Sequence, residues 1–201
     1  KEVRKEYLDQ AIVYLTSVNK IHPKYNDALL LLGNAYWERY RSLDSTFKYY
    51  NLILERNPKF DQVYKNIFES GMHSEFEKKE RADKNLAILK KLEKYNPNYY
   101  GVNYYLGRIS GRFKNDLLTS IKYFEKSLSI DSTNVELYKD LGVVYGMSRK
   151  FDKSAHVLEK AIELDSSDAI LRVNLAMTYL QVGKTKEALS AMDAVMKMNL
   201  D

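Results

Sequence analysis

A period of about 34 residues is the feature that most constrains how this chain can fold. When residues 135–168 are shifted forward by about 34 positions, Gly142 corresponds to Ala176 and Tyr145 corresponds to Tyr179. A small residue is thus replaced by a small one, and an aromatic residue by the same aromatic residue. The chain therefore consists of repeated structural units, each too small to bury its apolar surface alone.

Each period contains two apolar stripes at helical spacing, with the polar break SRKFD (148–152) between them. Apolar residues that recur three and four positions apart are typical of an amphipathic α-helix. The two stripes consist of Val135, Tyr138, Leu141 and Tyr145, and of Ala155, Leu158, Ala161 and Ile162. The pattern predicts an all-α chain built from helix–turn–helix units.

Small residues stand at fixed positions in both helices of a unit. Gly142 lies in the first helix and Ser154 in the second, with the large residues Tyr145 and Leu158 a few positions further along. Two helices can cross closely only where both carry small side chains, and large side chains then fill the space beside the crossing. We expect a bulky residue at Gly142 to overpack this crossing.

The motifs YKDLGVVY (138–145) and LLLLGNAYW (29–37) resemble the first helix of the tetratricopeptide repeat (TPR), a helix–turn–helix unit of about 34 residues. In this family a proline follows the second helix. It stands here at Pro23, Pro58 and Pro97, and is replaced in the later units by Ser132 and Ser166. Serine after aspartate is also a good turn former, so the break is kept. The resemblance implies a right-handed superhelical array, an α-solenoid.

The resemblance covers the whole chain as a single TPR array over residues 1–201. Residues 1–24 resemble the second helix of a preceding unit. Five repeats follow, at 26–60, 61–99, 100–134, 135–168 and 169–201.

The second repeat is irregular, with about five residues more than the family's length of about 34. Phe68, Gly71 and Asn85 stand where the family has a small residue, a tyrosine and an alanine. We expect either longer helices around residues 73–84 or a bulged turn there.

The TPR resemblance also implies a function. In such arrays the first helix of each repeat lines a concave groove that binds peptides or extended segments of partner proteins. The groove positions lie one, four, five, eight and eleven residues after the start of each repeat. Among them we select mostly polar and aromatic residues as candidate contacts: Asn34, Trp37, Lys65, Asn66, Glu69, Tyr104, Tyr105, Arg108, Lys139, Asp140 and Asn174. The chain is therefore predicted to be a protein-interaction scaffold.

Two specialised subclasses of the family fit less well. Members that bind the acidic carboxyl tails of chaperones carry a clamp of Lys, Asn and Arg, of which Asn34 and Asn66 match while Leu30, Gly101 and Tyr105 do not. The asparagine ladder of the O-linked N-acetylglucosamine transferases is similarly broken. As an alternative function we retain the non-catalytic TPR arm of a larger enzyme, such as a soluble or membrane-bound glycosyltransferase, that positions substrates.

The sequence carries little chemistry of its own. His22, His73 and His156 lie in different repeats, and the chain has no Cys. Glycine-rich phosphate loops, paired metal-binding histidines and nucleophile elbows are missing. We expect no catalysis, no cofactor and no metal site in this chain.

The net charge of +5 arises in residues 1–114, where acidic residues alternate with basic ones through 75–94. Alternation is typical of a solvated helix face, so we do not expect nucleic-acid binding. No apolar run approaches the roughly 20 residues that span a bilayer. We expect a cytoplasmic or periplasmic segment, or part of a longer membrane-anchored chain, and the Tyr, Asn, Lys and Ile content suggests a bacterial source.

The last predicted helix carries an apolar stripe of Ala188, Met192, Val195 and Met196. Arrays of this kind normally end in a cap with a polar outer face. The stripe therefore predicts either a longer chain or end-to-end self-association through Met192, Val195 and Met196.

Overall fold

The computed structural model describes residues 2–69 and 71–198, and every regular element in this part of the chain is a helix. The predicted all-α class is confirmed. The chain divides into two compact units, residues 1–97 (the N-terminal unit) and residues 98–201 (the C-terminal unit).

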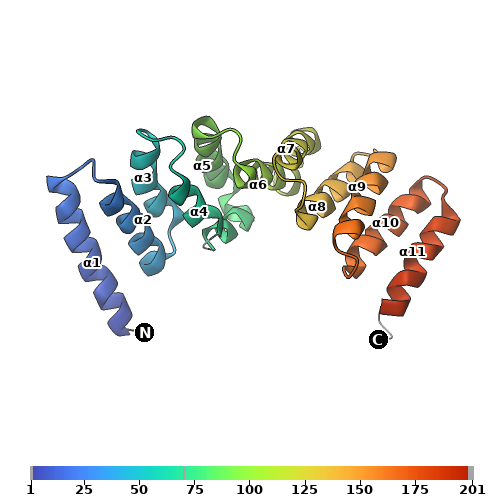
Figure 1. Ribbon diagram of the computed structural model, residues 1–201, viewed down its shortest axis with the longest axis horizontal. Coiled ribbons are helices and arrows are strands. Elements are labelled where there is room, and N and C mark those ends of the chain that lie inside the picture. Colours follow the sequence, from blue (N-terminus) through green and yellow to red (C-terminus); the bar gives the residue numbers. More distant parts are fainter. Residues whose placement is uncertain (1, 70, 199–201) are drawn as a thin grey trace. The chain divides into compact units, whose positions relative to one another are not determined.

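In the N-terminal unit, α2 packs against both α1 and α3, and short 3-10 helices (η) precede α5 (Figure 1). Ile12 of α1 meets Leu32 and Ala35 of α2 in a buried cluster. The elements are α1 (Glu2–Ile21), α2 (Asn26–Tyr40), α3 (Leu43–Leu54), α4 (Asp61–Glu69), η1 (Met72–Glu77), η2 (Lys79–Arg81) and α5 (Ala82–Tyr95).

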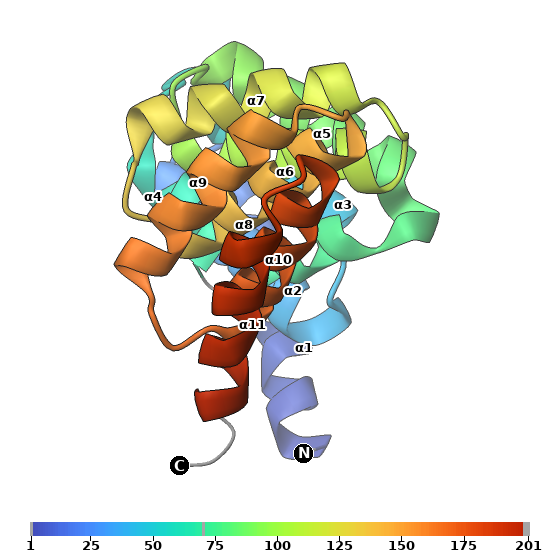
Figure 2. The ribbon, with the colours of Figure 1, turned by 90° about the vertical axis from the view of Figure 1, so that its right-hand side faces the viewer.

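The C-terminal unit is a regular succession of helical hairpins. The two helices of each hairpin pack side by side, as α10 and α11 do in Figure 2, and α7 and α9 also contact the first helix of the next hairpin. The elements are α6 (Tyr100–Arg112), α7 (Leu117–Ile130), α8 (Val135–Met147), α9 (Phe151–Leu164), α10 (Ala169–Gln181) and α11 (Thr185–Met198).

Small residues mark the crossings within the hairpins. A Cβ atom added to Gly142 would lie 2.7 Å from the side chain of Leu158, so the backbone of α8 sits directly on that leucine. The hydroxyl of Ser154 donates a hydrogen bond of 2.7 Å to the carbonyl oxygen of Gly142. The same arrangement recurs one hairpin earlier with Gly107, Phe124 and Ser120.

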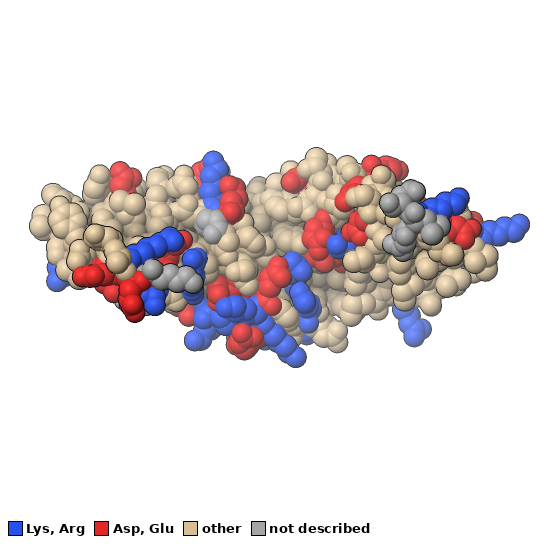
Figure 3. Space-filling model, turned by 90° about the horizontal axis from the view of Figure 1, so that it is seen from below, with Lys and Arg blue, Asp and Glu red and all other residues tan. Residues whose placement is uncertain are grey.

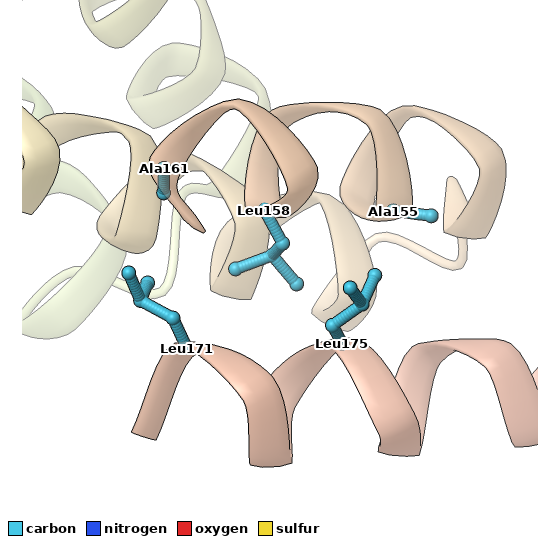
Figure 4. Packing of buried hydrophobic residues seen from close by; sticks show 5 residues of the cluster. All are labelled: Ala155, Leu158, Ala161, Leu171 and Leu175. Carbon is cyan, nitrogen blue, oxygen red and sulfur yellow. The ribbon is translucent and has the colours of Figure 1, made fainter. Parts of the chain in front are cut away.

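Between successive hairpins the contact is apolar. Figure 4 shows Leu158 of α9 pointing toward Leu171 and Leu175 of α10, with Ala155 and Ala161 on either side of it. Burying a leucine completely contributes about 1.5–3 kcal/mol, and Leu158 and Leu171 are almost fully buried. Each hairpin is thus stabilised by its neighbour.

Tyrosines add polar contacts between successive hairpins. Tyr145 of α8 donates a hydrogen bond of 2.5 Å to Glu125 of α7, and Tyr179 of α10 donates one of 2.6 Å to Glu159 of α9. Burial and the carboxylate of Glu159 raise the pKa of Tyr179 to about 12. The tyrosines therefore stay protonated and act as donors at neutral pH.

The turns that lack proline are held by aspartates. Asp131 accepts a hydrogen bond of 2.8 Å from the backbone N–H of Thr133, and Asp165 accepts one of 2.8 Å from that of Ser167. The bonds from Ser167 hold the pKa of Asp165 below its usual value. An Asx turn thus replaces the proline turn in these two repeats.

The irregular second repeat contains a connector of two 3-10 helices, η1 and η2, rather than longer α-helices. The side-chain amide of Asn85 is fully buried and donates a hydrogen bond of 2.5 Å to the carbonyl oxygen of Glu75. Glu75 is itself buried and pairs with Lys78 at 2.5 Å and with Arg81 at 3.4 Å. Asn85 therefore stabilises the inserted residues at a position where alanine offers no donor.

On α11 the predicted apolar stripe divides into two parts. Ala188 and Val195 are buried, whereas Met192 and Met196 are 39% and 63% exposed. None of the helices in residues 2–69 and 71–198 is both long enough and apolar enough to cross a membrane.

Candidate peptide-binding groove

The predicted groove residues all lie on the first helices of the repeats. They occupy α2 and α4 in the N-terminal unit and α6, α8 and α10 in the C-terminal unit. In chain order they are Asn34 and Trp37, then Lys65, Asn66 and Glu69, then Tyr104, Tyr105 and Arg108, then Lys139 and Asp140, and last Asn174.

In the N-terminal unit, the structure brings two predicted amides into direct contact. The amide nitrogen of Asn66 on α4 donates to the side-chain oxygen of Asn34 on α2 at 2.8 Å and to the hydroxyl of Tyr50 at 3.1 Å. Tyr50 in turn donates to Asn34, and Gln62 donates to the oxygen of Asn66 at 2.9 Å. These amides bridge neighbouring helices.

An equivalent bridge joins α6 and α8 in the C-terminal unit. The guanidinium of Arg108 lies 3.2 Å from the carboxylate of Asp140, and the hydroxyl of Tyr104 donates to the same carboxylate at 3.1 Å. Burial raises the pKa of Asp140, while the charge of Arg108 acts in the opposite direction. Burial also raises the pKa of Tyr104, with the charge of Asp140 as the next cause.

These two bridges occupy the same repeat positions. Asn34 and Arg108 each come directly after the glycine of their own repeat. Asn66 and Asp140 each come two residues before the position that this glycine has in the next repeat. The next such pair in the C-terminal unit is Val143 and Asn174. Because valine has no polar side-chain atom, this pair cannot form a bridge.

The predicted aromatic residues are largely covered. Trp37 is 4% exposed, Tyr104 is 6% exposed and Tyr105 is 8% exposed. The guanidinium of Arg41 lies 5.3 Å from the ring of Trp37, and that of Arg108 lies 5.6 Å from the ring of Tyr104. These buried rings pack against neighbouring side chains and offer little open face for stacking on a ligand.

Two of the remaining predicted residues form local ion pairs. Lys65 pairs with Asp61 at 2.7 Å on the exposed side of α4. Lys139 pairs with Glu136 at 2.7 Å and with Asp168 at 3.3 Å, and the bond to Glu136 is the main reason why the pKa of Lys139 is raised. Glu69 is exposed at the end of α4.

A pocket of about 390 Å³, here the α6–α8 pocket, lies between the first helices of two successive repeats. Phe124 of α7 is part of its apolar lining, and the bridged residues Arg108 and Asp140 line it as well. Its lining residues are Arg108, Gly111, Arg112, Asn115, Ser120, Phe124, Asp140, Val143, Val144 and Met147.

A second pocket of about 430 Å³, the α8–α10 pocket, lies one repeat further along. Leu158 of α9 takes the place that Phe124 has in the first pocket. The lining residues are Gly142, Val143, Gly146, Met147, Arg149, Phe151, Ser154, Leu158, Asn174, Met177, Thr178 and Gln181.

The two pockets are one site repeated. Residues of the α6–α8 pocket correspond to residues of the α8–α10 pocket at a separation of 34 or 35 positions. The matching pairs are Gly111 and Gly146, Ser120 and Ser154, Phe124 and Leu158, Asp140 and Asn174, Val143 and Met177, Val144 and Thr178, and Met147 and Gln181.

The comparisons with known proteins agree with a fold of repeated helical hairpins. A family model described as tetratricopeptide repeat matches residues 169–201. The resemblance to the tetratricopeptide repeat is thus confirmed by the sequence of this last repeat, and the fold is that of solved tetratricopeptide repeat structures. No curated protein matches the chain as a whole or in part.

Solved structures similar to this chain cover nearly all of it at low sequence identity. YrrB, described as a TPR protein with an unusual peptide-binding site, has a TM-score of 0.71 at 14% identity and covers 93% of each chain. A MamA protein has a TM-score of 0.69 at 16% identity, covering 86% of this chain and 91% of its own. MamA from Desulfovibrio magneticus RS-1 has a TM-score of 0.56 at 16% identity, with 98% and 88% covered. At these identities the likeness concerns the fold.

Sequence reasoning missed the apolar part of the pockets. The groove position eight residues after a repeat start, which selects Asn34, Glu69 and Arg108, falls on Val143 and Met177 in the later repeats. Val143 and Met177 are not among the candidate contacts, which are mostly polar and aromatic, although they are 43% and 61% exposed. The available signal was an exposed apolar residue directly after the small residue of the first helix, Gly142 or Ala176.

Among the described residues, no cluster of three or more His, Asp or Glu side chains is arranged to hold a metal ion. His22 and His156 are exposed, and His73 is half-buried.

Proposed function

We propose that the C-terminal unit of this chain binds an extended peptide segment of a partner protein across α6, α8 and α10. The observation that carries the proposal is the pair of equivalent pockets, which present the same kind of hollow twice in succession. Concave sites with an apolar lining and a few fixed polar groups are typical ligand sites. The chain supplies binding, and we propose no catalytic step within it.

Exposed apolar side chains support this proposal. Val143 and Met147 border both pockets, and Met177 borders the second; the three are 43%, 57% and 61% exposed. A cluster of exposed apolar side chains in a hollow, with polar residues around it, is typical of a protein-interaction surface. A partner side chain that covers them removes apolar area from water and so gains binding free energy.

The distribution of charge favours a peptide over a nucleic acid. On the face drawn in Figure 3, Lys and Arg side chains lie intermingled with Asp and Glu side chains. Nucleic-acid binding instead requires a basic surface that follows the phosphates, and its affinity falls steeply with salt. The observed mixture of charges is better suited to a peptide of defined sequence.

The experiment that tests the proposal is selection from a display library of random peptides, with the intact chain as the target. Selected peptides are then measured against Val143→Glu and Val143→Arg, because Val143 borders both pockets. The matched controls are Leu118→Glu and Leu118→Arg, at an exposed position on α7 that lines neither pocket.

We expect peptides whose binding is lost with both Val143 variants and kept with both Leu118 variants. Loss with either sign of charge would identify the pockets themselves as the contact. If no peptide is selected, or if binding is indifferent to Val143, the groove of the C-terminal unit is not the working surface.

A further inference from the structure

A further pocket of the C-terminal unit lies outside the proposed groove. It has a volume of about 560 Å³, and it shares no lining residue with the α6–α8 pocket or the α8–α10 pocket. Residues of the second helices α9 and α11 line it together with residues of α10. We call it the α9–α11 pocket.

Two carboxylates of this pocket converge on one tyrosine. Glu159 of α9 accepts the hydrogen bond of 2.6 Å from the hydroxyl of Tyr179. Burial raises the pKa of Tyr179, and the charges of Glu159 and Glu187 act in the same direction. Glu187 is exposed and forms no hydrogen bond or ion pair with another described residue. The pocket therefore holds negative charge that the described chain does not neutralise at Glu187.

The preceding repeat shows what an equivalent pair of tyrosine and glutamate holds. Tyr145 and Glu125 stand 34 positions before Tyr179 and Glu159, and their hydrogen bond is 2.5 Å long. The Nζ atom of Lys153 on the following helix, α9, lies 5.5 Å from the centre of the Tyr145 ring and 4.0 Å from the carboxylate of Glu125. In this repeat the chain itself supplies a cation to the pair.

The last repeat has a carboxylate at the position of this lysine. The same shift of 34 positions takes Lys153 to Glu187. It also takes three larger residues of α9 to small residues of α11 that line the pocket, namely His156 to Ser190, Val157 to Ala191 and Lys160 to Ala194. The last hairpin thus offers space and a second carboxylate where the preceding one has a lysine.

The cations nearest to the pocket are engaged elsewhere. Lys184 lies 5.6 Å from the ring of Tyr179, but it does not line the pocket and forms no ion pair with a described residue. Arg172 lines the pocket and donates to the carbonyl oxygen of Ser166 at 2.7 Å. The place of Lys153 is therefore left for a cation from another molecule.

We propose that the α9–α11 pocket binds a lysine or arginine side chain from a basic segment of a partner protein. The charged group lies beside Glu159 and Glu187, as Lys153 lies beside Glu125 in the preceding repeat. The aliphatic stem packs against Ile162 and Leu175, which also line the pocket. Long basic side chains commonly bury their stems in this way while the charged end stays near water. The site is separate from the proposed groove and does not rest on it.

The test uses two labelled peptides, measured by fluorescence anisotropy with the intact chain. One is Ser-Gly-Arg-Leu-Arg-Gly-Ser, and the other has citrulline, a neutral side chain of nearly the same shape, in place of both arginines. The protein variants Glu187→Lys and Ala191→Val each introduce the residue of the preceding repeat. Asp193→Lys is the matched control, because Asp193 is exposed on the same helix and does not line the pocket.

We expect the arginine peptide to bind the parent chain about tenfold more tightly than the citrulline peptide, because charge-assisted hydrogen bonds are stronger than neutral ones. Glu187→Lys should weaken its binding by about tenfold, since an attraction becomes a repulsion. Ala191→Val should weaken it by about threefold, because the larger side chain takes up part of the pocket.

Asp193→Lys should change the affinity by less than about twofold. Residue 193 lies six positions, or roughly 9 Å, along α11 from residue 187, and charges at this separation are largely screened at 0.15 M salt. Circular dichroism and urea denaturation should show that all three variants are folded, since each substitution lies at an exposed or partly exposed position.

Absence of binding, or equal binding of the two peptides, would overturn the proposed cation site. An equal loss with Glu187→Lys and Asp193→Lys would show a general attraction of charge and would also overturn it. Binding that ignores Ala191→Val would place the cation outside the pocket. If Val143→Asn weakens binding of the arginine peptide and Glu187→Lys does not, the peptide lies in the groove, so this inference fails while the proposed function stands.

Discussion

The N-terminal and C-terminal units use the same repeat positions for different purposes. In the N-terminal unit, Asn34 and Asn66 bond to each other and to Tyr50 across the gap between α2 and α4. In the C-terminal unit, the equivalent positions hold an ion pair in one gap and the unbridged pair Val143 and Asn174 in the next. Depending on two side chains, the same positions of neighbouring first helices can therefore be bridged or left unbridged.

The two units also differ in regularity. Tyr145 and Tyr179 connect successive hairpins of the C-terminal unit through Glu125 and Glu159. In the second repeat, Gly71 stands at the tyrosine position, and a 3-10 connector held by Asn85 follows it. A repeat can thus lose its consensus residues when other buried hydrogen bonds take over their role.

The largest expected effect concerns the regular unit. Gly142→Leu should destabilise the fold by about 3 kcal/mol, because even a Cβ at this position meets Leu158 at 2.7 Å. Urea denaturation followed by circular dichroism measures the loss. Gly146→Ala is the matched control, since its Cβ would meet only the hydroxyl of Ser154, at 3.6 Å, and its stability should match or exceed that of the parent. Equal stability of the leucine variant would mean that the helices cross elsewhere.

In the irregular second repeat, a substitution toward the residue that the family prefers should lower the stability of the fold. Asn85→Ala installs the residue that the family prefers, yet it should cost about 1–2 kcal/mol, because the buried carbonyl of Glu75 loses its donor. Hydrogen exchange should show faster opening of η1 and η2 in the variant. A variant as stable as the parent would show that the connector does not depend on this amide.

Asp140 and Asp165 of the C-terminal unit should change the stability of the fold in opposite directions as the pH changes. Burial raises the pKa of Asp140, so its ionisation opposes folding, and stability that is present at low pH is lost as the pH rises through the folded-state pKa. Asp165 has a lowered pKa, so its contribution is present above the unfolded-state pKa and is lost as the pH falls.

Comparing Asp140→Asn and Asp165→Asn with the parent by urea denaturation between pH 3 and pH 6 (roughly the range around a carboxyl pKa) tests this difference. As the pH rises, Asp140→Asn should gain stability relative to the parent, and Asp165→Asn should lose it. Differences that run in the same direction for both variants would contradict the assignment.

The smallest expected effect on stability comes from giving the C-terminal unit an amide pair like that of the N-terminal unit. Val143→Asn places an amide opposite Asn174, as Asn34 lies opposite Asn66. Because position 143 is exposed, the free energy of unfolding should change by no more than about 0.5 kcal/mol. Peptides selected on the parent chain should nevertheless bind more weakly, since an amide replaces an exposed apolar side chain that lines both pockets. Unchanged peptide affinity would show that Val143 does not control access.

The sequence by itself determined the helices and the residues at their crossings. Apolar residues at helical spacing define α8 and α9, and the period places Gly142 over Leu158 because only a small residue allows two helices to approach so closely. The family resemblance, confirmed by the comparisons, follows from the same positions. These features depend on contacts within one repeat or between neighbours, which recur with the period.

The tertiary structure alone decided which candidate side chains remain available. Whether an amide such as Asn66 faces a ligand or bonds to Asn34 depends on residues about one repeat away, and the sequence does not state the partner of a hydrogen bond. Likewise, Tyr105 and Val143 both lie on first helices, but neighbouring helices cover the tyrosine and leave the valine in a hollow. Local periodicity specifies the helices, whereas the packing between them specifies the surface.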